Sequence, residues 1–156
     1  MDKQKKFMQR AIDLSRKSVK TGGGPFGAVI VKNGKIIAEA SNGVTKNIDP
    51  TGHAEINAIR KAAQALQNYD LSGCEIYSSC EPCPMCLGAI YWARLDKLYF
   101  ANTKKDAAKI NFDDQFIYEE IEKPYAKRKL VTRQMMADEA IKAFEDWEKM
   151  EGKTRY

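Results

Sequence analysis

The chain has 156 residues, 44% hydrophobic and 30% charged, with a formal net charge of +5. This length and composition are ordinary for one soluble globular domain that can bury a core. No apolar run approaches the roughly 18 residues that a bilayer-spanning helix needs, and the Lys-rich first twenty residues lack the apolar stretch of a signal peptide, so we expect a cytoplasmic protein with no membrane partner.

The first forty residues predict a helix followed by a β-hairpin. Apolar side chains recur at helical spacing over residues 3–20, and the glycines and proline of residues 22–25 end that helix. Residues 26–31 form an apolar run that predicts a strand. Asn33-Gly34 is a strong two-residue hairpin turn, and residues 35–40 return as the partner strand.

The central part of the chain alternates helices and strands with short connections. After a polar loop over residues 41–52, a helix is expected from His53 to about residue 67. Residues 74–79 predict a short strand. Pro84 suits the first turn of the next helix, which runs to about residue 93, and residues 95–100 predict another strand.

The pattern weakens beyond residue 102. Residues 103–109 read as helical, 111–118 as an ordered loop and 128–134 as a strand. Asp138 is placed to cap a final helix that runs to Trp147, and residues 152–156 form a tail. The order of elements predicts a single α/β domain over residues 1–156, a three-layer α-β-α arrangement in which helices cover both faces of a mixed central sheet.

Two short motifs carry candidate metal ligands. The one histidine opens the triplet His53-Ala54-Glu55, and Cys83 and Cys86 follow about thirty residues later in Pro-Cys-Pro-Met-Cys. One imidazole and two thiolates can hold a zinc ion at three corners of a tetrahedron, with the fourth left for water, as in catalytic sites. Both predicted helices would bring the ligands to their N-termini, where thiolates are favoured. Glu55, two residues from the histidine, is the candidate general base.

Two other cysteines complicate this assignment. Cys80, Cys83 and Cys86 are evenly spaced by three, so spacing alone does not say which pair binds, and a four-ligand structural site is the competing interpretation. We favour Cys83 and Cys86 because Pro84 places them on the opening turn of a helix, and the role of Cys80 stays open. We predict that Cys74 is a small buried hydrophobic residue. The clustering itself favours metal binding over disulfides.

The sequence of these motifs, H-x-E followed by P-C-x-x-C, resembles the cytidine deaminase superfamily of zinc-dependent nucleobase deaminases over roughly residues 3–105. Further stretches resemble the bacterial guanine deaminases over the whole length. These are Gly-Pro-Phe-Gly-Ala-Val at residues 24–29, residues 81–94, Phe-Asp-Asp at residues 112–114 and the final tyrosine.

The resemblance implies the cytidine deaminase-like fold and hydrolytic deamination of guanine to xanthine and ammonia. It implies one Zn²⁺ per chain on His53, Cys83 and Cys86, with Glu55 as the proton shuttle. It also implies that Asp114 contacts the base and helps protonate the departing ammonia, and that the purine meets Phe26, Asn42, Trp92 and Tyr156. In that family the C-terminal segment, here about residues 130–156, crosses to a partner subunit, which implies a domain-swapped homodimer.

Three other functions compete with this one. Guanosine deamination needs only a pocket that admits ribose. Deamination of a tRNA adenosine fits the same metal motifs and the positive charge, although the Phe-Asp-Asp segment and the tyrosine-ended tail would crowd a polynucleotide. A zinc-stabilised RNA-binding module without turnover has no need of Glu55. The lysines are spread along both terminal regions with no aromatic platform beside them, so we expect a small-molecule purine rather than a nucleic acid.

Overall fold

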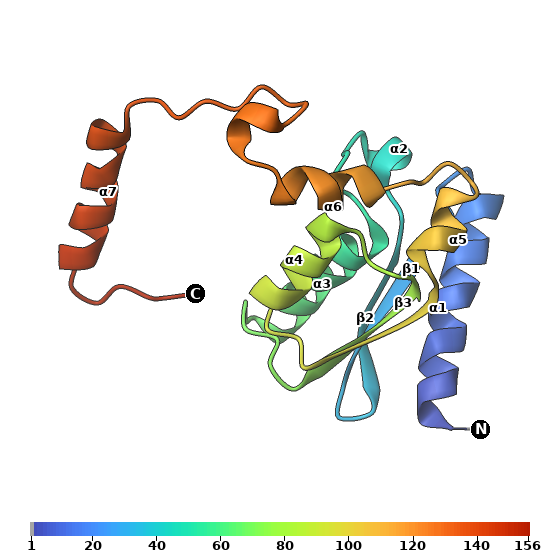
Figure 1. Cartoon of the computed structure of the whole chain (residues 1–156). Helices are drawn as coiled ribbons and strands as arrows, with labels where there is room; N and C mark the ends of the chain where they lie inside the picture. Colours follow the sequence, from blue (N-terminus) through green and yellow to red (C-terminus); the bar gives the residue numbers. More distant parts are fainter. Residues whose placement is uncertain (1) are drawn as a thin grey trace. The chain divides into compact units, whose positions relative to one another are not determined.

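The computed structural model describes residues 2–156, which divide into an N-terminal unit ending at Gln115 and a C-terminal unit, Phe116–Tyr156. The elements of the N-terminal unit (Figure 1) are α1 (Lys3–Lys20), β1 (Gly27–Lys32), β2 (Lys35–Ser41), α2 (Val44–Asn47), α3 (Ala54–Leu66), β3 (Cys74–Cys80), α4 (Pro84–Trp92), β4 (Lys97–Asn102) and α5 (Lys104–Ala108). Helix α6 (Gln115–Glu122) begins at the end of this unit, and the 3₁₀ turn η1 (Tyr125–Lys127) and α7 (Ala137–Lys149) follow in the C-terminal unit.

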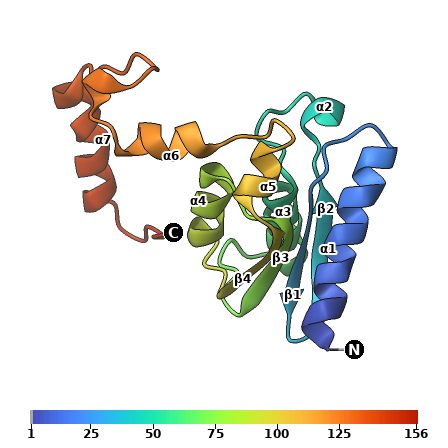
Figure 2. The same cartoon turned by 45° about the vertical axis from the view of Figure 1, so that its right-hand side comes forward.

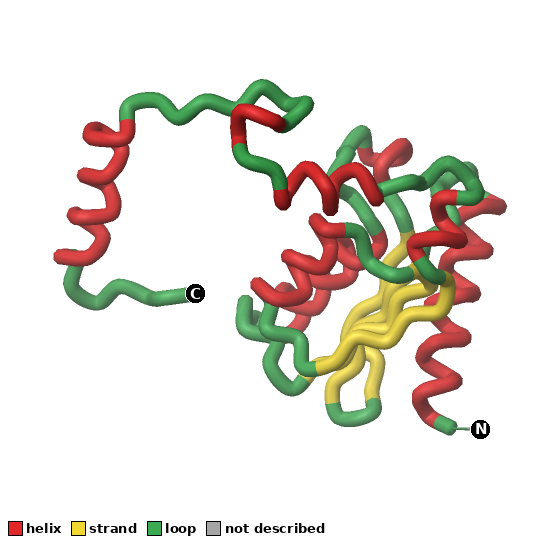
Figure 3. The backbone as a smooth tube through the Cα atoms, in the orientation of Figure 1, coloured by secondary structure: helices red, strands yellow, loops and turns green. Residues whose placement is uncertain are grey.

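The four strands form one mixed sheet in the order β2-β1-β3-β4, visible as the central layer of the N-terminal unit in Figure 3. Strand β1 pairs antiparallel with both β2 and β3, whereas β3 and β4 run parallel. The predicted hairpin turn is confirmed. Asn33 and Gly34 both have positive φ, 51° and 72°, which is the conformation that Asn-Gly favours between two strands.

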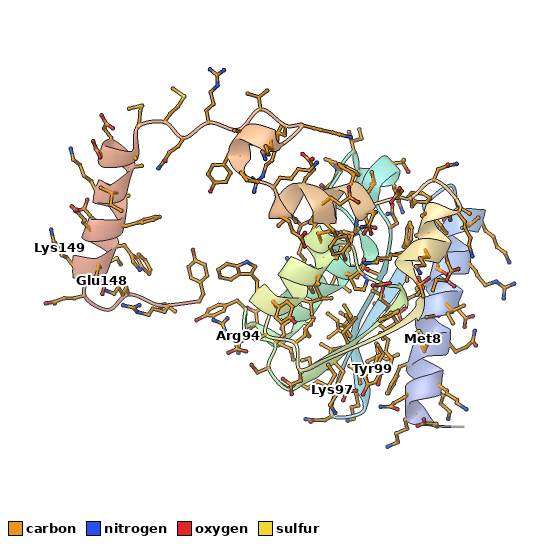
Figure 4. All side chains as sticks on the ribbon, in the orientation of Figure 1. Met8, Arg94, Lys97, Tyr99, Glu148 and Lys149 are labelled. Atoms are coloured by element: carbon orange, nitrogen blue, oxygen red, sulfur yellow. The ribbon has the colours of Figure 1, made fainter. Side chains whose placement is uncertain are left out.

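Alternation along the strands divides the core between two faces. Ala28 and Ile30 of β1 pack in a cluster with α3 and α4, whereas Val29 and Val31 pack with α1. Figure 2 shows α1 on one side of the sheet and α3 with α4 on the other. Met8 of α1, labelled in Figure 4, packs on the second cluster. The predicted three-layer α-β-α class is therefore confirmed, because a sheet that is buried on both faces needs helices on both.

The predicted elements are wrong in four places. The loop expected over residues 41–52 contains the single turn α2, and the loop expected over 111–118 gives way to α6. Residues 128–134 form no strand, and Leu130 in that stretch is 77% exposed. An extended segment without a paired neighbour gains nothing from its β-propensity. Asp138 does not cap α7: Met136 is the N-cap residue, and Asp138 lies in the first turn, where its charge suits the helix dipole.

The C-terminal unit is held by local polar contacts. Glu120 Oε2 accepts a hydrogen bond from the Lys129 backbone at 2.7 Å, and Arg128 lies 4.9 Å from the centre of the Tyr125 ring. Glu148, labelled on α7 in Figure 4, pairs with Arg155 at 3.2 Å. None of the helices formed by residues 2–156 combines the length and the apolarity that a membrane crossing requires.

Candidate active site

His53 is placed by the start of α3. The helix begins at Ala54, so His53 is its N-cap residue rather than its first helical residue. The backbone carbonyl of His53 accepts the Asn57 N–H at 3.0 Å, and this bond ties the histidine to the first turn. Its side chain is half-buried. Since the N-terminus of a helix exposes unpaired N–H groups, the ligand stands at the positive end of α3.

The two cysteines stand in the same relation to α4. Cys83 is the N-cap residue, Pro84 is the first helical residue, and Cys86 is buried in the first turn. Proline suits this position because the N–H it lacks has no partner within the helix. The Cys83 carbonyl accepts the Leu87 N–H at 2.9 Å. The prediction that Pro84 sets both thiols on the opening turn is therefore confirmed.

The three ligand atoms converge. His53 Nδ1 lies 3.5 Å from Cys83 Sγ and 3.5 Å from Cys86 Sγ, and all three atoms lie within 4.8 Å of one another. A tetrahedral zinc with bonds of about 2.3 Å to sulfur and about 2.0–2.1 Å to nitrogen requires an S···N separation of about 3.6 Å. The donor set and its spacing therefore fit one zinc ion.

Cys80 does not join this group of candidate ligands among residues 2–156. Its Sγ lies 3.8 Å from the backbone carbonyl of Thr103, and burial raises the pKa of its thiol to about 11. The arrangement favours the three-ligand type of site over the four-ligand structural type.

The thiols of Cys83 and Cys86 shift each other's pKa in opposite directions. The hydrogen bond from Cys86 lowers the pKa of Cys83 to about 4, and the same bond raises the pKa of Cys86. The hydrogen bond with Cys83 also raises the pKa of His53. Because zinc binds thiolates and neutral imidazole, metal uptake by this cluster displaces protons.

Glu55 lies beside the ligands in the first turn of α3, and its side chain is buried. Ser78 of β3 donates a hydrogen bond to Oε1 at 3.1 Å, whereas Oε2 lies 3.5 Å from Cys86 Sγ. Burial raises the pKa of the Glu55 carboxyl. A buried carboxyl with one oxygen held and the other turned toward the ligand group is suited to taking up and releasing a proton.

A pocket of about 290 Å³ opens beside these groups. His53, Glu55 and Cys83 line it on the metal side. The opposite side belongs to residues 103–114, which we call the distal wall and which contribute Ala107 and Asn111–Asp114. Phe26 also lines the pocket, and its ring meets that of Phe112 edge to face with centroids 5.0 Å apart. The pocket thus combines a group of candidate metal ligands, aromatic surface and several polar groups.

Two of the five predicted substrate residues line the pocket. Phe26 and Asp114 line the pocket, and burial raises the pKa of the Asp114 carboxyl. Asn42 instead lines a neighbouring polar hollow, where its Oδ1 accepts the Val44 N–H at 3.1 Å. Trp92, at the end of α4, is 69% exposed and lines a shallow hollow away from the metal ligands. Tyr156 lies in the C-terminal unit and is 71% exposed.

Several residues of the site were not predicted from the sequence. Ser78, Glu81, Asn111 and Asp113 carry polar groups that either line the pocket or bind Glu55. A signal was available for Ser78 and Glu81, which lie near the carboxyl end of β3. Strands β3 and β4 are parallel neighbours, so the residues near their carboxyl ends lie at one edge of the sheet, which is where α/β proteins place their sites.

Comparison with known proteins gives consistent results. The profile described as "Cytidine and deoxycytidylate deaminase zinc-binding region" matches residues 1–102. Guanine deaminase of Bacillus subtilis is 51% identical over 96% of this chain and 97% of its own length. The X-ray structure of guanine deaminase from Bacillus subtilis superposes with a TM-score of 0.95 at 50% identity, covering 97% of this chain and 98% of that one. A tRNA-specific adenosine deaminase of Buchnera aphidicola is 44% identical over 69% of this chain and 67% of its own length.

Proposed function

Because the chain belongs to the family of zinc-binding cytidine and deoxycytidylate deaminases, we propose that it is a zinc-dependent aminohydrolase that converts guanine to xanthine and ammonia. The observation that carries this proposal is the 51% identity to a guanine deaminase along 96% of the chain. That similarity extends past residue 102, where the shared deaminase region ends, into the distal wall with Asp114.

His53, Cys83 and Cys86 would hold one zinc ion per chain, because their donor atoms and separations suit it. When bound in such a site, zinc lowers the pKa of water toward about 7, which supplies a hydroxide-like nucleophile at neutral pH. Two thiolates as ligands, together with the free thiols of Cys74 and Cys80, suit a reducing compartment, and we place the protein in the cytoplasm.

Glu55 moves the protons of the reaction. Water adds its oxygen to C2 of guanine, and the bond from C2 to the exocyclic nitrogen breaks. Of the two water protons, one goes to ring nitrogen N3 and the other leaves with the amine as ammonia, so the atoms balance. Oε2 of Glu55 faces the ligand group and carries both protons in turn, while Ser78 holds Oε1.

The residues around the pocket bind and orient the purine. Asp114 accepts hydrogen bonds from ring N–H groups and assists the departing ammonia, and Phe26 supplies an aromatic surface for a flat ring. Asn42 pairs with the base in this proposal, because its side-chain amide can both donate and accept hydrogen bonds. A site that pairs buried polar groups with one base discriminates strongly against others, because a wrong base leaves those groups unpaired.

Trp92 and Tyr156 complete the pocket across a homodimer in this proposal. Their exposed side chains are 69% and 71% accessible. The apolar face of α7 supports the same view, because Ile141, Phe144 and Trp147 recur along one side of the helix and are all exposed. Such a face is normally covered by another apolar surface. We propose that a second copy covers it and that residues 130–156 are exchanged between subunits.

Deamination of a tRNA adenosine is the second candidate function, and the 44% identity to a tRNA-specific adenosine deaminase favours it. That similarity covers 69% of the chain, against 96% for the guanine deaminase. It therefore covers a smaller part of the chain than the similarity to the guanine deaminase does. Guanosine deamination is the third outcome that an assay must separate.

The deciding experiment is an ultraviolet assay of the zinc-loaded protein with guanine, guanosine, adenine, cytosine and a tRNA anticodon stem-loop. We expect turnover of guanine to xanthine, and turnover of the stem-loop or of guanosine instead would overturn the assignment. Metal analysis should give about one zinc per chain, as a three-ligand site holds one ion. Cys83→Ser should lose it, and Cys80→Ser, the matched control, should keep it.

A further inference from the structure

We propose that Glu81 is a positioning residue, which fixes the distal wall, residues 103–114, against the loop that carries Cys83. This inference deepens the proposed function and rests on it. Glu81 stands two residues before Cys83, directly after β3. It therefore lies in the same loop as Cys83. Its hydrogen bonds, however, join this loop to Asn102 and Lys104, where the distal wall begins.

Two hydrogen bonds of Glu81 hold the point where the distal wall begins. Its backbone N–H donates to the Asn102 carbonyl at 2.8 Å, which continues the parallel pairing of Cys80 with Asn102 by one bond. Its carboxylate oxygen Oε2 accepts the backbone N–H of Lys104, the first residue of α5, at 2.9 Å. A charged acceptor makes the stronger class of hydrogen bond. One residue thus ties both β4 and α5 to the metal loop.

Beyond this point the distal wall is stiffened by its own contacts. Thr103 and Asp106 form a reciprocal capping box at the start of α5. The Ala107 N–H donates to the Thr103 carbonyl at 3.1 Å, and the Phe112 N–H donates to the Ala107 carbonyl at 3.0 Å. A segment bonded in this way moves as one piece, so a change of angle where it begins is carried along to Asp114.

The distal wall meets the rest of the pocket again through the ring contact of Phe112 with Phe26. That contact is a single edge-to-face pair and permits sliding, whereas the Glu81 bond sets both distance and direction. Loss of the carboxylate removes this acceptor from the Lys104 N–H, and the wall can then tilt. A displacement of about 1 Å in a positioning group can cost on the order of 10²-fold in rate.

Glu81 also lines the pocket, so direct contact with the purine is the rival explanation. The two explanations differ in what they require of the side chain. A tether needs one acceptor oxygen, which glutamine keeps, whereas contact through charge needs the carboxylate itself. They differ also in their dependence on Asp114, because a tether acts through that residue and a direct contact does not.

The test compares Glu81→Gln, Glu81→Ala and Asp70→Ala in zinc-loaded protein. Asp70 is the matched control, because its carboxylate also accepts a backbone N–H, that of Ser72 at 2.9 Å, in a turn away from the pocket. We expect Glu81→Ala to lower kcat/KM for guanine by about 10-fold or more, through kcat as well as KM, because Asp114 both binds the base and assists the departing ammonia. Glu81→Gln should stay within about 3-fold of the wild type, as should Asp70→Ala.

A double mutant separates positioning from a general structural role. If Glu81 acts through Asp114, then Glu81→Ala should cost little further activity in an Asp114→Asn background, whereas independent effects would multiply. Multiplying effects, an equal loss in Glu81→Gln and Glu81→Ala, or an unchanged Glu81→Ala would each overturn the proposal.

Amide hydrogen exchange keeps this result distinct from failure of the proposed function. In Glu81→Ala with zinc still bound, residues 103–114 should exchange faster while α1 and α3 do not change, and Glu81→Gln should resemble the wild type. If the wild type fails to deaminate guanine but the two Glu81 variants show this exchange pattern, the proposed function is wrong and the tether stands. If guanine is deaminated but exchange in residues 103–114 is unaltered, the tether is wrong.

Discussion

The N-terminal and C-terminal units bury their apolar side chains to very different degrees. The N-terminal unit packs two clusters against opposite faces of its sheet, with Ile76 and Tyr77 at 0% and 1% exposure. None of residues 116–156, all of them described, is buried, and Phe144 on α7 is 73% exposed. A helix with one apolar face gains most of its stability from the apolar surface that packs against that face. The first unit therefore has its own core, whereas residues 116–156 form no buried core of their own.

The largest effect is expected from Glu55, which we propose carries the protons and which lies in the N-terminal unit. Glu55→Gln removes the proton carrier while keeping the shape of the side chain, and we expect kcat to fall by about 10³-fold. Zinc content should stay at that of the wild type, because Glu55 is not a ligand. Glu75→Gln, a substitution on a half-buried β3 residue that pairs with Lys97, is the control. Full activity in Glu55→Gln would remove this residue from its role.

The difference in burial itself can be tested with one pair of substitutions. Ile76→Ala creates a cavity in a filled core, and we expect it to lower the free energy of unfolding by about 2–5 kcal/mol. Ile141→Ala alters a side chain that is 48% exposed, so in dilute protomer the change should stay within about 0.5 kcal/mol.

Urea unfolding of both variants over a range of protein concentrations sharpens the comparison. If a second copy covers α7, the destabilisation by Ile141→Ala should grow with concentration, since an oligomer is stabilised by mass action. The effect of Ile76→Ala on the core should persist at every concentration. An Ile141→Ala effect that is equally large in dilute protein would mean that α7 is covered within its own chain.

A smaller effect is expected from the tail. Deletion of residues 152–156 should lower kcat/KM by about 10- to 100-fold if Tyr156 closes a pocket, because a loosened lid misplaces the base and admits water. Mixing this truncated chain with Glu55→Gln distinguishes a partner's tail from the chain's own. Exchange of tails restores one working site in the mixed dimer, so activity should reappear. No recovery, or no loss on truncation, would refute the exchanged lid.

The smallest expected effect is a pH dependence of the distal wall. Hydrogen bonds from Thr103 lower the pKa of Asp106 to about 2, below the value of about 3.9 for an unfolded chain. A lowered folded-state pKa stabilises the protein above the unfolded value, and this contribution is lost as the pH falls through about 2. Asp106→Asn should therefore melt slightly below the wild type at pH 6, and the two melting curves should converge near pH 2. A difference that persists at pH 2 would contradict this assignment.

The group of candidate metal ligands could be predicted because its information is local. The spacing of His53 and Glu55 is set within one helix start, and that of Cys83 and Cys86 within another, with Pro84 marking the first turn. The distal wall could not be predicted in the same way. Its contact with the metal loop depends on Glu81 meeting Lys104, residues 23 apart in the chain, and no local pattern encodes that pairing.

The amino-acid sequence alone therefore determined the elements of the sheet, the Asn33-Gly34 turn and the chemistry of the ligands, since periodicity, turn preference and ligand spacing act over a few residues. Tertiary structure alone decided that Cys80 stands apart from the ligands, that Ser78 holds Glu55, and that residues 128–134 form no strand. Each of these outcomes depends on which distant segments meet. Long-range pairing is decided by the packing of the whole unit, and a single sequence carries no local record of it.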